Sequence, residues 1–147
     1  MGTMPELKKV SIHLQTTIVN GQEEESYELR TTGTLQHKGE SLYLRYEEIQ
    51  EDMQSVKAIV KWSEDEVFIM RSGHVKMRQK FVKDVMTTSV YESPHGNMQM
   101  LTTAKSMKHH FNENAYEGKI VLIYGLNMQG NDVGEYRMEI TYKEAVE

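Results

Sequence analysis

The fold is indicated most clearly by one short stretch, Ser41-Leu42-Tyr43-Leu44-Arg45-Tyr46-Glu47-Glu48. Side chains of a β-strand alternate between two faces, so both leucines of this stretch share a face with Tyr46 and Glu48. An apolar strand face that ends in a carboxylate has two interpretations. Glu48 either belongs to a site inside a β-barrel or marks the solvated end of a strand.

The same alternation recurs along most of the chain and predicts an all-β fold. Turn-forming pairs such as Asn20-Gly21 and Ser72-Gly73 separate the alternating stretches at near-regular intervals. The strands expected from this pattern are residues 10–18, 27–35, 41–48, 56–62, 67–71, 75–81, 87–91, 98–103, 120–128 and 134–142. Residues 104–118 fit either a helical turn or a continued strand followed by a loop. Because the strands are consecutive and the turns short, we predict a single antiparallel up-and-down β-barrel of about 8–10 strands.

Gly33 lies inside one of these predicted strands. A glycine at such a position weakens a strand unless the strand bulges, bends or lets another backbone approach closely. Curved barrels use glycines of this kind to turn corners.

Length and composition bound the domain organisation and the compartment. A chain of 147 residues with 27% charged and 38% hydrophobic residues is typical of one globular domain. We assign that domain to residues 1–147, with residues 1–7 as a loose N-terminal segment. No stretch is apolar enough for a signal peptide or a membrane-spanning helix, so we expect a cytoplasmic protein without a membrane partner. The absence of cysteine excludes disulfides and thiol catalysis.

Three short segments occur in an order that resembles the YwiB-like family: Leu44-Arg45-Tyr46-Glu47-Glu48, Arg71-Ser72-Gly73 and Tyr91-Glu92-Ser93-Pro94-His95-Gly96. The resemblance extends from about Val10 to Tyr142, and the chain departs from the family where it has Ser93-Pro94 in place of a Thr-Pro pair. The family comprises small bacterial proteins of unknown function with a calycin-like, lipocalin-like β-barrel. The resemblance therefore implies a barrel with a potential internal cavity, and it carries over no catalytic residue.

A barrel of this size either holds a small ligand or is filled by its own side chains. The 11 methionines suit an adaptable apolar lining, but they equally suit a solid core whose irregular gaps they fill. The residues expected inside are Ile12, Leu14, Leu29, Leu44, Tyr46, Val60, Trp62, Ile69, Met77, Phe81, Met100, Leu122, Tyr124, Met138 and Ile140. The sequence leaves open whether these side chains enclose a void.

The polar residues that we consider first for a site are Tyr46, Glu48, Arg71 and Tyr91. If the faces that carry Glu48 and Arg71 both point inward, a carboxylate and a guanidinium meet at the rim of an apolar cavity and must satisfy each other. Arg71 could then bind the carboxylate or phosphate head of an amphipathic ligand. The structural alternative is an ion pair that closes the barrel end, or side chains that point to solvent.

No motif for catalysis, metal binding or cofactor binding is found in the sequence. The chain lacks a G-x-S-x-G nucleophile elbow, a phosphate-binding loop and an H-E-x-x-H zinc motif. The histidines are scattered, and the adjacent His109 and His110 point to opposite faces of a strand. We therefore expect no catalytic residue, no metal and no cofactor.

Nucleic acid is also not expected as a partner. The formal net charge is -5, whereas nonspecific nucleic-acid binding depends on neutralising phosphates. Lys76, Arg78 and Lys80 form one basic strand face, but that strand face carries no aromatic side chain on which bases could stack.

Three functions remain compatible with the sequence. The preferred one is a cytoplasmic barrel that binds a small, mainly apolar ligand, with Tyr46, Glu48, Arg71 and Tyr91 at the site. The leading alternative is a protein-interaction or structural module with a filled core, which acts through its surface or as a homodimer. The third, which the sequence disfavours, is a small enzyme that uses the interior acid.

Overall fold

The computed structural model describes residues 7–49 and 54–145. Across these residues it contains ten strands and no helix, which confirms the all-β prediction. The strands are β1 (Leu7–Asn20), β2 (Glu23–Lys38), β3 (Ser41–Ile49), β4 (Ser55–Trp62), β5 (Val67–Gly73), β6 (Met77–Phe81), β7 (Met86–Ser93), β8 (Gly96–Asn112), β9 (Glu117–Met128) and β10 (Asn131–Glu144). Consequently, no helix long and apolar enough to cross a membrane occurs in the described part of the chain. The predicted loose segment, residues 1–7, lies outside the described residues except for Leu7, which belongs to β1 instead.

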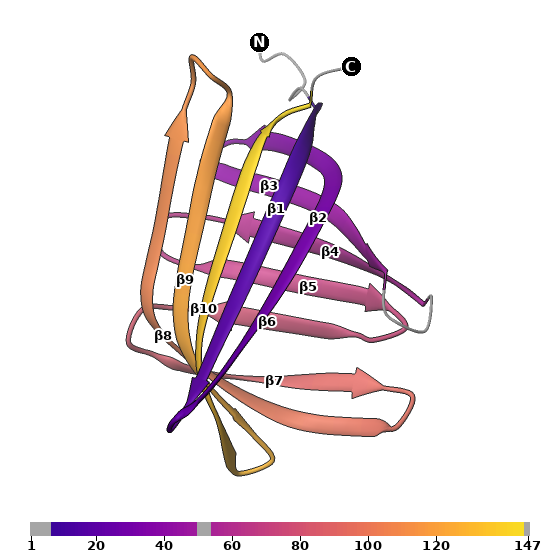
Figure 1. Ribbon diagram of the computed structural model, residues 1–147, viewed down its shortest axis with the longest axis vertical. Coiled ribbons are helices and arrows are strands. Elements are labelled where there is room, and N and C mark those ends of the chain that lie inside the picture. The colour runs from indigo at the N-terminus through magenta and orange to yellow at the C-terminus, as the bar shows by residue number, and fades with distance from the viewer. Residues whose placement is uncertain (1–6, 50–53, 146–147) are drawn as a thin grey trace.

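The strands form one antiparallel sheet in which strands that are neighbours in sequence pair with each other, except β6 and β7. The order is β6-β5-β4-β3-β2-β1-β10-β9-β8-β7, so the sheet closes through a ladder between β1 and β10 (Figure 1). This ladder runs from the Val10–Glu144 pair to the Val19–Glu135 pair. The up-and-down order that the short turns predict is therefore confirmed, and the sheet is a nearly closed barrel.

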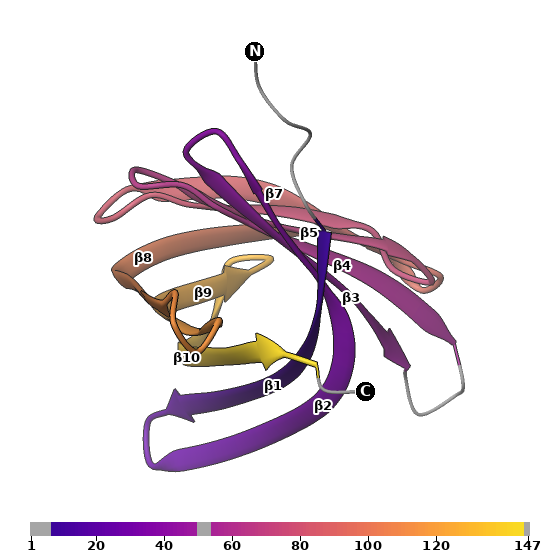
Figure 2. The ribbon, with the colours of Figure 1, turned by 90° about the horizontal axis from the view of Figure 1, so that it is seen from above.

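Two long strands bend and so belong to two layers of the barrel. β2 pairs with β1 along its length but with β3 only from Gly33 onward. β8 pairs first with β7 and then with β9, and its register shifts between Ala104 and Ser106. Strands β3–β7 consequently run across β1, β9 and β10, as Figures 1 and 2 show from two directions. Residues 104–118 contain no helical turn, because β8 continues to Asn112 and a turn then leads into β9.

Gly33 allows the backbones of β2 and β3 to come close together at this bend. A Cβ atom at this position would overlap the Arg45 carbonyl oxygen and lie 2.8 Å from Cδ1 of Ile12. Of the three reasons that the sequence offers for a glycine inside this strand, a close backbone approach is thus present at Gly33.

The barrel is incompletely closed between β6 and β7, which we call the seam. Lys76 and Glu92 exchange two backbone hydrogen bonds of 2.9 Å at one end of the seam. At its other end the Asp84 amide donates to the Ala104 carbonyl over 2.8 Å. Between these contacts the described residues of β6 and β7 form no ladder.

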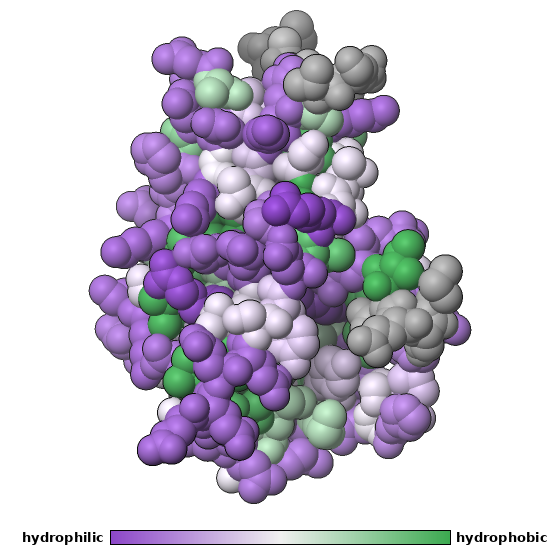
Figure 3. All heavy atoms as spheres, in the orientation of Figure 1, coloured by the Kyte–Doolittle hydropathy of each residue, from purple (hydrophilic) through white to green (hydrophobic). Residues whose placement is uncertain are grey.

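The core lies inside the barrel, where the inward positions of all the strands meet. Of the residues expected inside, Leu29 and Trp62 are half-buried and pack against the core. The others are buried, and many of them, such as Leu44, Ile69 and Ile140, have no exposed surface. The outer face over β1, β9 and β10 is mostly hydrophilic (Figure 3). The period-two alternation therefore identified the inside of the barrel correctly.

We predict that Gly33→Ala lowers the free energy of unfolding by at least about 2 kcal/mol, because the new methyl group would collide with backbone of β3. The matched control is Gly125→Ala in β9, where a Cβ would have no heavy atom within 4 Å. That control should leave stability unchanged or raise it by about 0.5 kcal/mol through the unfolded state. Urea unfolding measures both values, and equal effects would contradict the proposed close approach.

Candidate ligand-binding site

A cavity of about 530 Å³ occupies the end of the barrel opposite the chain termini. Its wall combines the C-terminal parts of β1 and β3 with the N-terminal parts of β2, β8 and β10. The methionines in this wall are Met77, Met98, Met100, Met128 and Met138. Thioether side chains are flexible and polarisable, so such a wall can adapt to apolar molecules of different shape.

Tyrosines line the same cavity. The rings of Tyr124 and Tyr136 stack with their centroids 5.2 Å apart, and Phe81 contacts Tyr124 edge-on at 4.9 Å. Burial raises the pKa of Tyr124 above its ordinary value, so its hydroxyl stays neutral. Tyr91, half-buried on β7, also lines the cavity. The sequence predicts Tyr91 and Tyr124 as inward or site residues but does not single out Tyr136.

Glu48 and Arg71 form an ion pair in the wall of this cavity. The Arg71 Nε donates to Glu48 Oε1 over 3.1 Å, and each side chain is only 19% exposed. Burial is the largest single effect and lowers the pKa of Arg71, but the interactions with Glu48, Tyr46 and Tyr124 together outweigh it, so the pKa stands above its ordinary value. Arg71 is therefore always charged, and the pairing considered from the sequence is observed.

Ala58 explains why Tyr46 and Arg71 can approach each other. Tyr46 on β3 and Arg71 on β5 are both register partners of Ala58, which lies between them on β4. A small residue at this position leaves room for two large side chains to lean together. Tyr46 does not line the cavity itself. It lies behind Arg71 in the row of register partners that crosses β3, β4 and β5.

The Tyr46 hydroxyl is buried and has no hydrogen-bond partner among the described residues. Burial raises its pKa to about 12, while the nearby Arg71 charge opposes that rise. The guanidinium is thus close enough to the hydroxyl to lower its pKa. No hydrogen bond from the Arg71 Nη atoms is found in the described part of the chain. The Arg71 Nη atoms are consequently available to donate to an acceptor in the cavity.

Gln79 adds a polar group that the sequence reasoning missed. It lies between Met77 and Phe81 on the inward face of β6, and its side chain is buried. Its Nε2 donates to the Thr102 Oγ1 over 2.9 Å across the seam. A glutamine at an inward position of an otherwise apolar strand was the available signal.

The opposite end of the barrel is filled by aromatic side chains. His109 Nε2 and the Tyr142 hydroxyl are 2.6 Å apart, and the Trp62 ring lies 5.2 Å from His109. Phe111 stacks on Tyr142 at 6.3 Å and meets Tyr116 edge-on at 5.4 Å. These contacts occupy this end with the chain's own rings, so the cavity opens at the other end.

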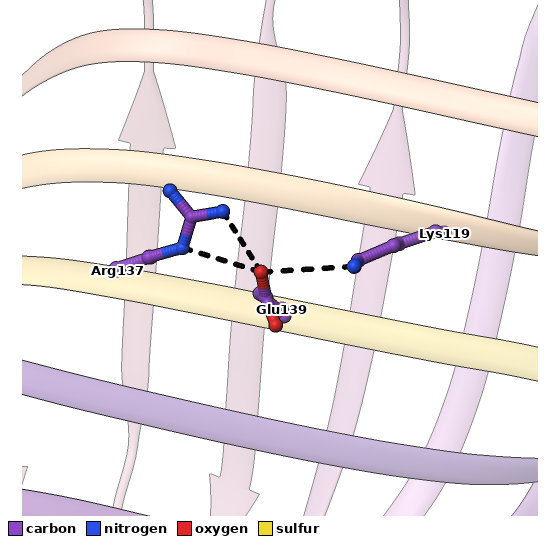
Figure 4. A network of polar contacts seen from close by, with 3 residues as sticks. All are labelled: Lys119, Arg137 and Glu139. Atoms are coloured by element: carbon purple, nitrogen blue, oxygen red, sulfur yellow. Dashed lines mark hydrogen bonds and ion pairs between the residues drawn. The ribbon is translucent and has the colours of Figure 1, made fainter.

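Charged residues outside the barrel satisfy one another on β9 and β10. Glu139 accepts hydrogen bonds from Arg137 of 3.2 and 2.9 Å and pairs with Lys119 at 3.7 Å (Figure 4). The Arg137 hydrogen bond is the main reason that the pKa of Glu139 lies below its ordinary value. Within the described residues no three histidine, aspartate or glutamate side chains gather as metal ligands would.

Comparison with known proteins relates the chain to an uncharacterised group. Residues 12–140 match the family model of the Domain of unknown function DUF1934. The chain is 35% identical over 134 residues to "Uncharacterized beta-barrel protein YwiB" of Bacillus subtilis (strain 168), covering 91% of this chain and 92% of that protein. The crystal structure of the ywiB protein from Bacillus subtilis superposes with a TM-score of 0.84 at 33% identity, covering 97% of this chain and 96% of the other.

We predict that Tyr46→Phe leaves the free energy of unfolding unchanged or raises it by up to about 1 kcal/mol, because the lost hydroxyl is buried without a partner. Tyr142→Phe is the matched comparison, since it removes a hydroxyl that is bonded to His109. It should cost about 1 kcal/mol. Chemical denaturation measures both, and a clear loss for Tyr46→Phe would mean that its hydroxyl has a partner in solution.

Acidification from about pH 7 to pH 5 should destabilise the protein partly through His109. Burial, with smaller contributions from His37 and His110, lowers the pKa of His109 in the folded state. The unfolded chain then binds the proton at a higher pH, so this contribution is present above about pH 6.5 and is lost as the pH falls. His109→Gln should flatten the measured stability profile in this window, whereas His95→Gln in the exposed β7–β8 turn should not. Parallel profiles for wild type and His109→Gln would exclude this role.

Proposed function

Because this chain belongs to the DUF1934 family, whose function is unknown, we propose its function from the cavity: it binds a small, mainly apolar molecule with a hydrogen-bond-accepting head group. The observation that carries the proposal is a cavity of about 530 Å³ with a methionine-rich wall and the Glu48–Arg71 pair within it. Ligand sites typically have volumes of about 300–1,000 Å³, a mostly apolar wall and a few convergent polar groups.

Arg71 is the residue that we assign to the head group. Glu48 engages its Nε, which fixes the plane of the guanidinium and leaves the Nη atoms available. Tyr46 packs behind the guanidinium and supports its position. A carboxylate or phosphate head would satisfy the Nη donors, because the guanidinium fork matches two acceptor oxygens. Glu48 would then act as a positioning residue, and Tyr91 would contact the apolar part of the ligand.

The proposal assigns to the protein both the shape of a calycin-like barrel and the ligand-binding role of one. The support is an up-and-down barrel with one filled end and a cavity at the other, and it rests on analogy between folds. We place the activity in the cytoplasm, because the composition of the chain gives no sign of export.

An interaction module is the second candidate, and exposed apolar side chains on an edge strand favour it. Val85, Met86 and Val90, on β7 and just before it, are 49%, 63% and 49% exposed. A homodimer that covers these side chains is compatible with ligand binding at the cavity. A module with a filled core has less support, because the cavity interrupts the core.

Two fluorescent probes should separate the apolar and polar contributions to binding. We predict that the anionic 8-anilinonaphthalene-1-sulfonate and the neutral N-phenyl-1-naphthylamine both bind the folded protein. Arg71→Met should weaken the anionic probe roughly 10-fold or more, as expected for a lost charge-assisted hydrogen bond, and affect the neutral probe little. Met128→Trp should weaken both probes, because the larger side chain fills the cavity.

Arg30→Met is the control for loss of charge, because Arg30 is 72% exposed on the outside of β2. It should change neither affinity. Thermal unfolding of each variant verifies that the barrel is intact. Failure of both probes to bind the folded wild type, or binding that Met128→Trp leaves unchanged, would refute the proposed function. Native mass spectrometry of the purified protein tests independently for a bound cellular molecule.

A further inference from the structure

The outer face of β3–β6 combines cations and aromatic rings in continuous lateral rows. Tyr43, Lys61, Phe68 and Lys80 are successive register partners from β3 to β6. These residues alternate with buried core residues along each strand, so their side chains point outward. The next row contains Arg45, Ile59, Met70 and Arg78. We call the two rows together the cationic face.

Each aromatic ring of this face is in contact with several cations. The Arg78 guanidinium lies 4.7 Å from the centre of the Phe68 ring, and Lys80 Nζ lies 5.7 Å from it. Around Tyr43, the charged groups of Arg45, Lys61 and Lys38 lie at 5.3, 5.7 and 5.8 Å from the ring centre. The expectation of no nucleic-acid partner considers one strand at a time, whereas neighbouring strands supply the aromatic rings beside Arg78 and Lys80.

Few carboxylates neutralise the cationic face. Glu66 pairs with Lys80 at 3.4 Å. Glu47 lies opposite Lys57 in the ladder and accepts a hydrogen bond from Ser55. No other ion pair involves an outward cation of β3–β6 in the described part of the chain. By contrast, three cations outside β8–β10, Lys105, Lys119 and Arg137, are paired with Glu135 or Glu139 (Figure 4). The cationic face is thus a locally basic surface on a chain whose formal net charge is -5.

We propose that the cationic face binds single-stranded nucleic acid. Tyr43 and Phe68 are two strands apart, which corresponds to about 10 Å at the usual spacing between strands. Lys61 lies between them in the same row and can meet the phosphate backbone that links two stacked bases. Sequence-tolerant binding of single strands depends on this combination of aromatic platforms and cations.

The same geometry disfavours the other polyanions. Duplex bases are already stacked on one another, so they cannot stack on Tyr43 or Phe68, and recognition of a duplex needs an element that enters a groove. A membrane surface favours apolar side chains that protrude into the lipid. Phe68, Ile59 and Met70 are instead only half-exposed and lie among cations.

The direct test is fluorescence anisotropy of the full chain with labelled oligonucleotides of about ten residues, a length within known single-strand site sizes. We expect oligouridine and oligothymidine to bind at low salt, and a duplex of equal length to bind at least 10-fold more weakly. The logarithm of affinity should fall with the logarithm of salt concentration by about 0.7 for each phosphate neutralised.

Variants separate stacking from charge. Phe68→Leu and Tyr43→Leu keep apolar bulk but remove the ring, and each should weaken single-strand binding roughly 5- to 100-fold without changing the salt slope. Lys61→Gln should weaken binding and reduce the slope by about 0.7. Lys105→Gln and Lys119→Gln, on the outside of β8 and β9, should have no effect.

Three results would overturn the proposal. The first is no binding of either single strand at low salt by a protein whose melting curve shows it folded. The second is normal binding by Phe68→Leu and Tyr43→Leu together with weaker binding by Lys61→Gln, which would mean generic attraction of polyanions. The third is binding to phosphatidylserine vesicles as tight as to the oligonucleotides, which would identify a lipid surface instead.

Discussion

The structure depends on one constraint: a sheet of backbone hydrogen bonds must leave as few unpaired edges as possible. Eight of the ten strands have a ladder on both sides, because β1 and β10 join the two ends of the chain. Only β6 and β7 face each other without a ladder. Short backbone contacts close the two ends of that seam, and the buried Gln79–Thr102 hydrogen bond crosses it from inside. A polar pair in the core therefore stabilises the closure of the barrel.

Closure by two bent strands also determines where a cavity can exist. The bends near Gly33 and between Ala104 and Ser106 bring two sets of strands across each other, which flattens the barrel. One end is filled by aromatic rings such as those of His109 and Tyr142. The other end holds the cavity, which is lined by flexible thioethers and the Glu48–Arg71 pair. The same bends thus produce a solid half and a hollow half.

The sequence predicted features that depend on alternation within one strand. The ten strands, the inward residues and the meeting of Glu48 with Arg71 follow from a period of two together with the assumption of a closed barrel. Features that depend on the register between strands were not predictable. Ala58 has its role because it faces Tyr46 on one side and Arg71 on the other.

The cationic face illustrates the same limit. The β6 strand alone has no outward aromatic ring, but the neighbouring β5 places Phe68 directly opposite Lys80 of β6. Gln79 could have been recognised, since a polar side chain at an inward position needs a buried partner, but Thr102 lies on a distant strand. Sequence patterns show which residues share a face within one strand, but they do not show which residues are partners across neighbouring strands.

The ladder between β1 and β10 has a consequence for biosynthesis. These strands are separated by almost the whole described chain, so β1 has only β2 as a partner while the ribosome is still making the rest. The apolar inner face of each early strand stays uncovered until the last strand emerges, a stage at which exposed strand edges favour aggregation. The acidic run Glu23-Glu24-Glu25 at the start of β2 then gives the first hairpin a charge that opposes association between nascent chains.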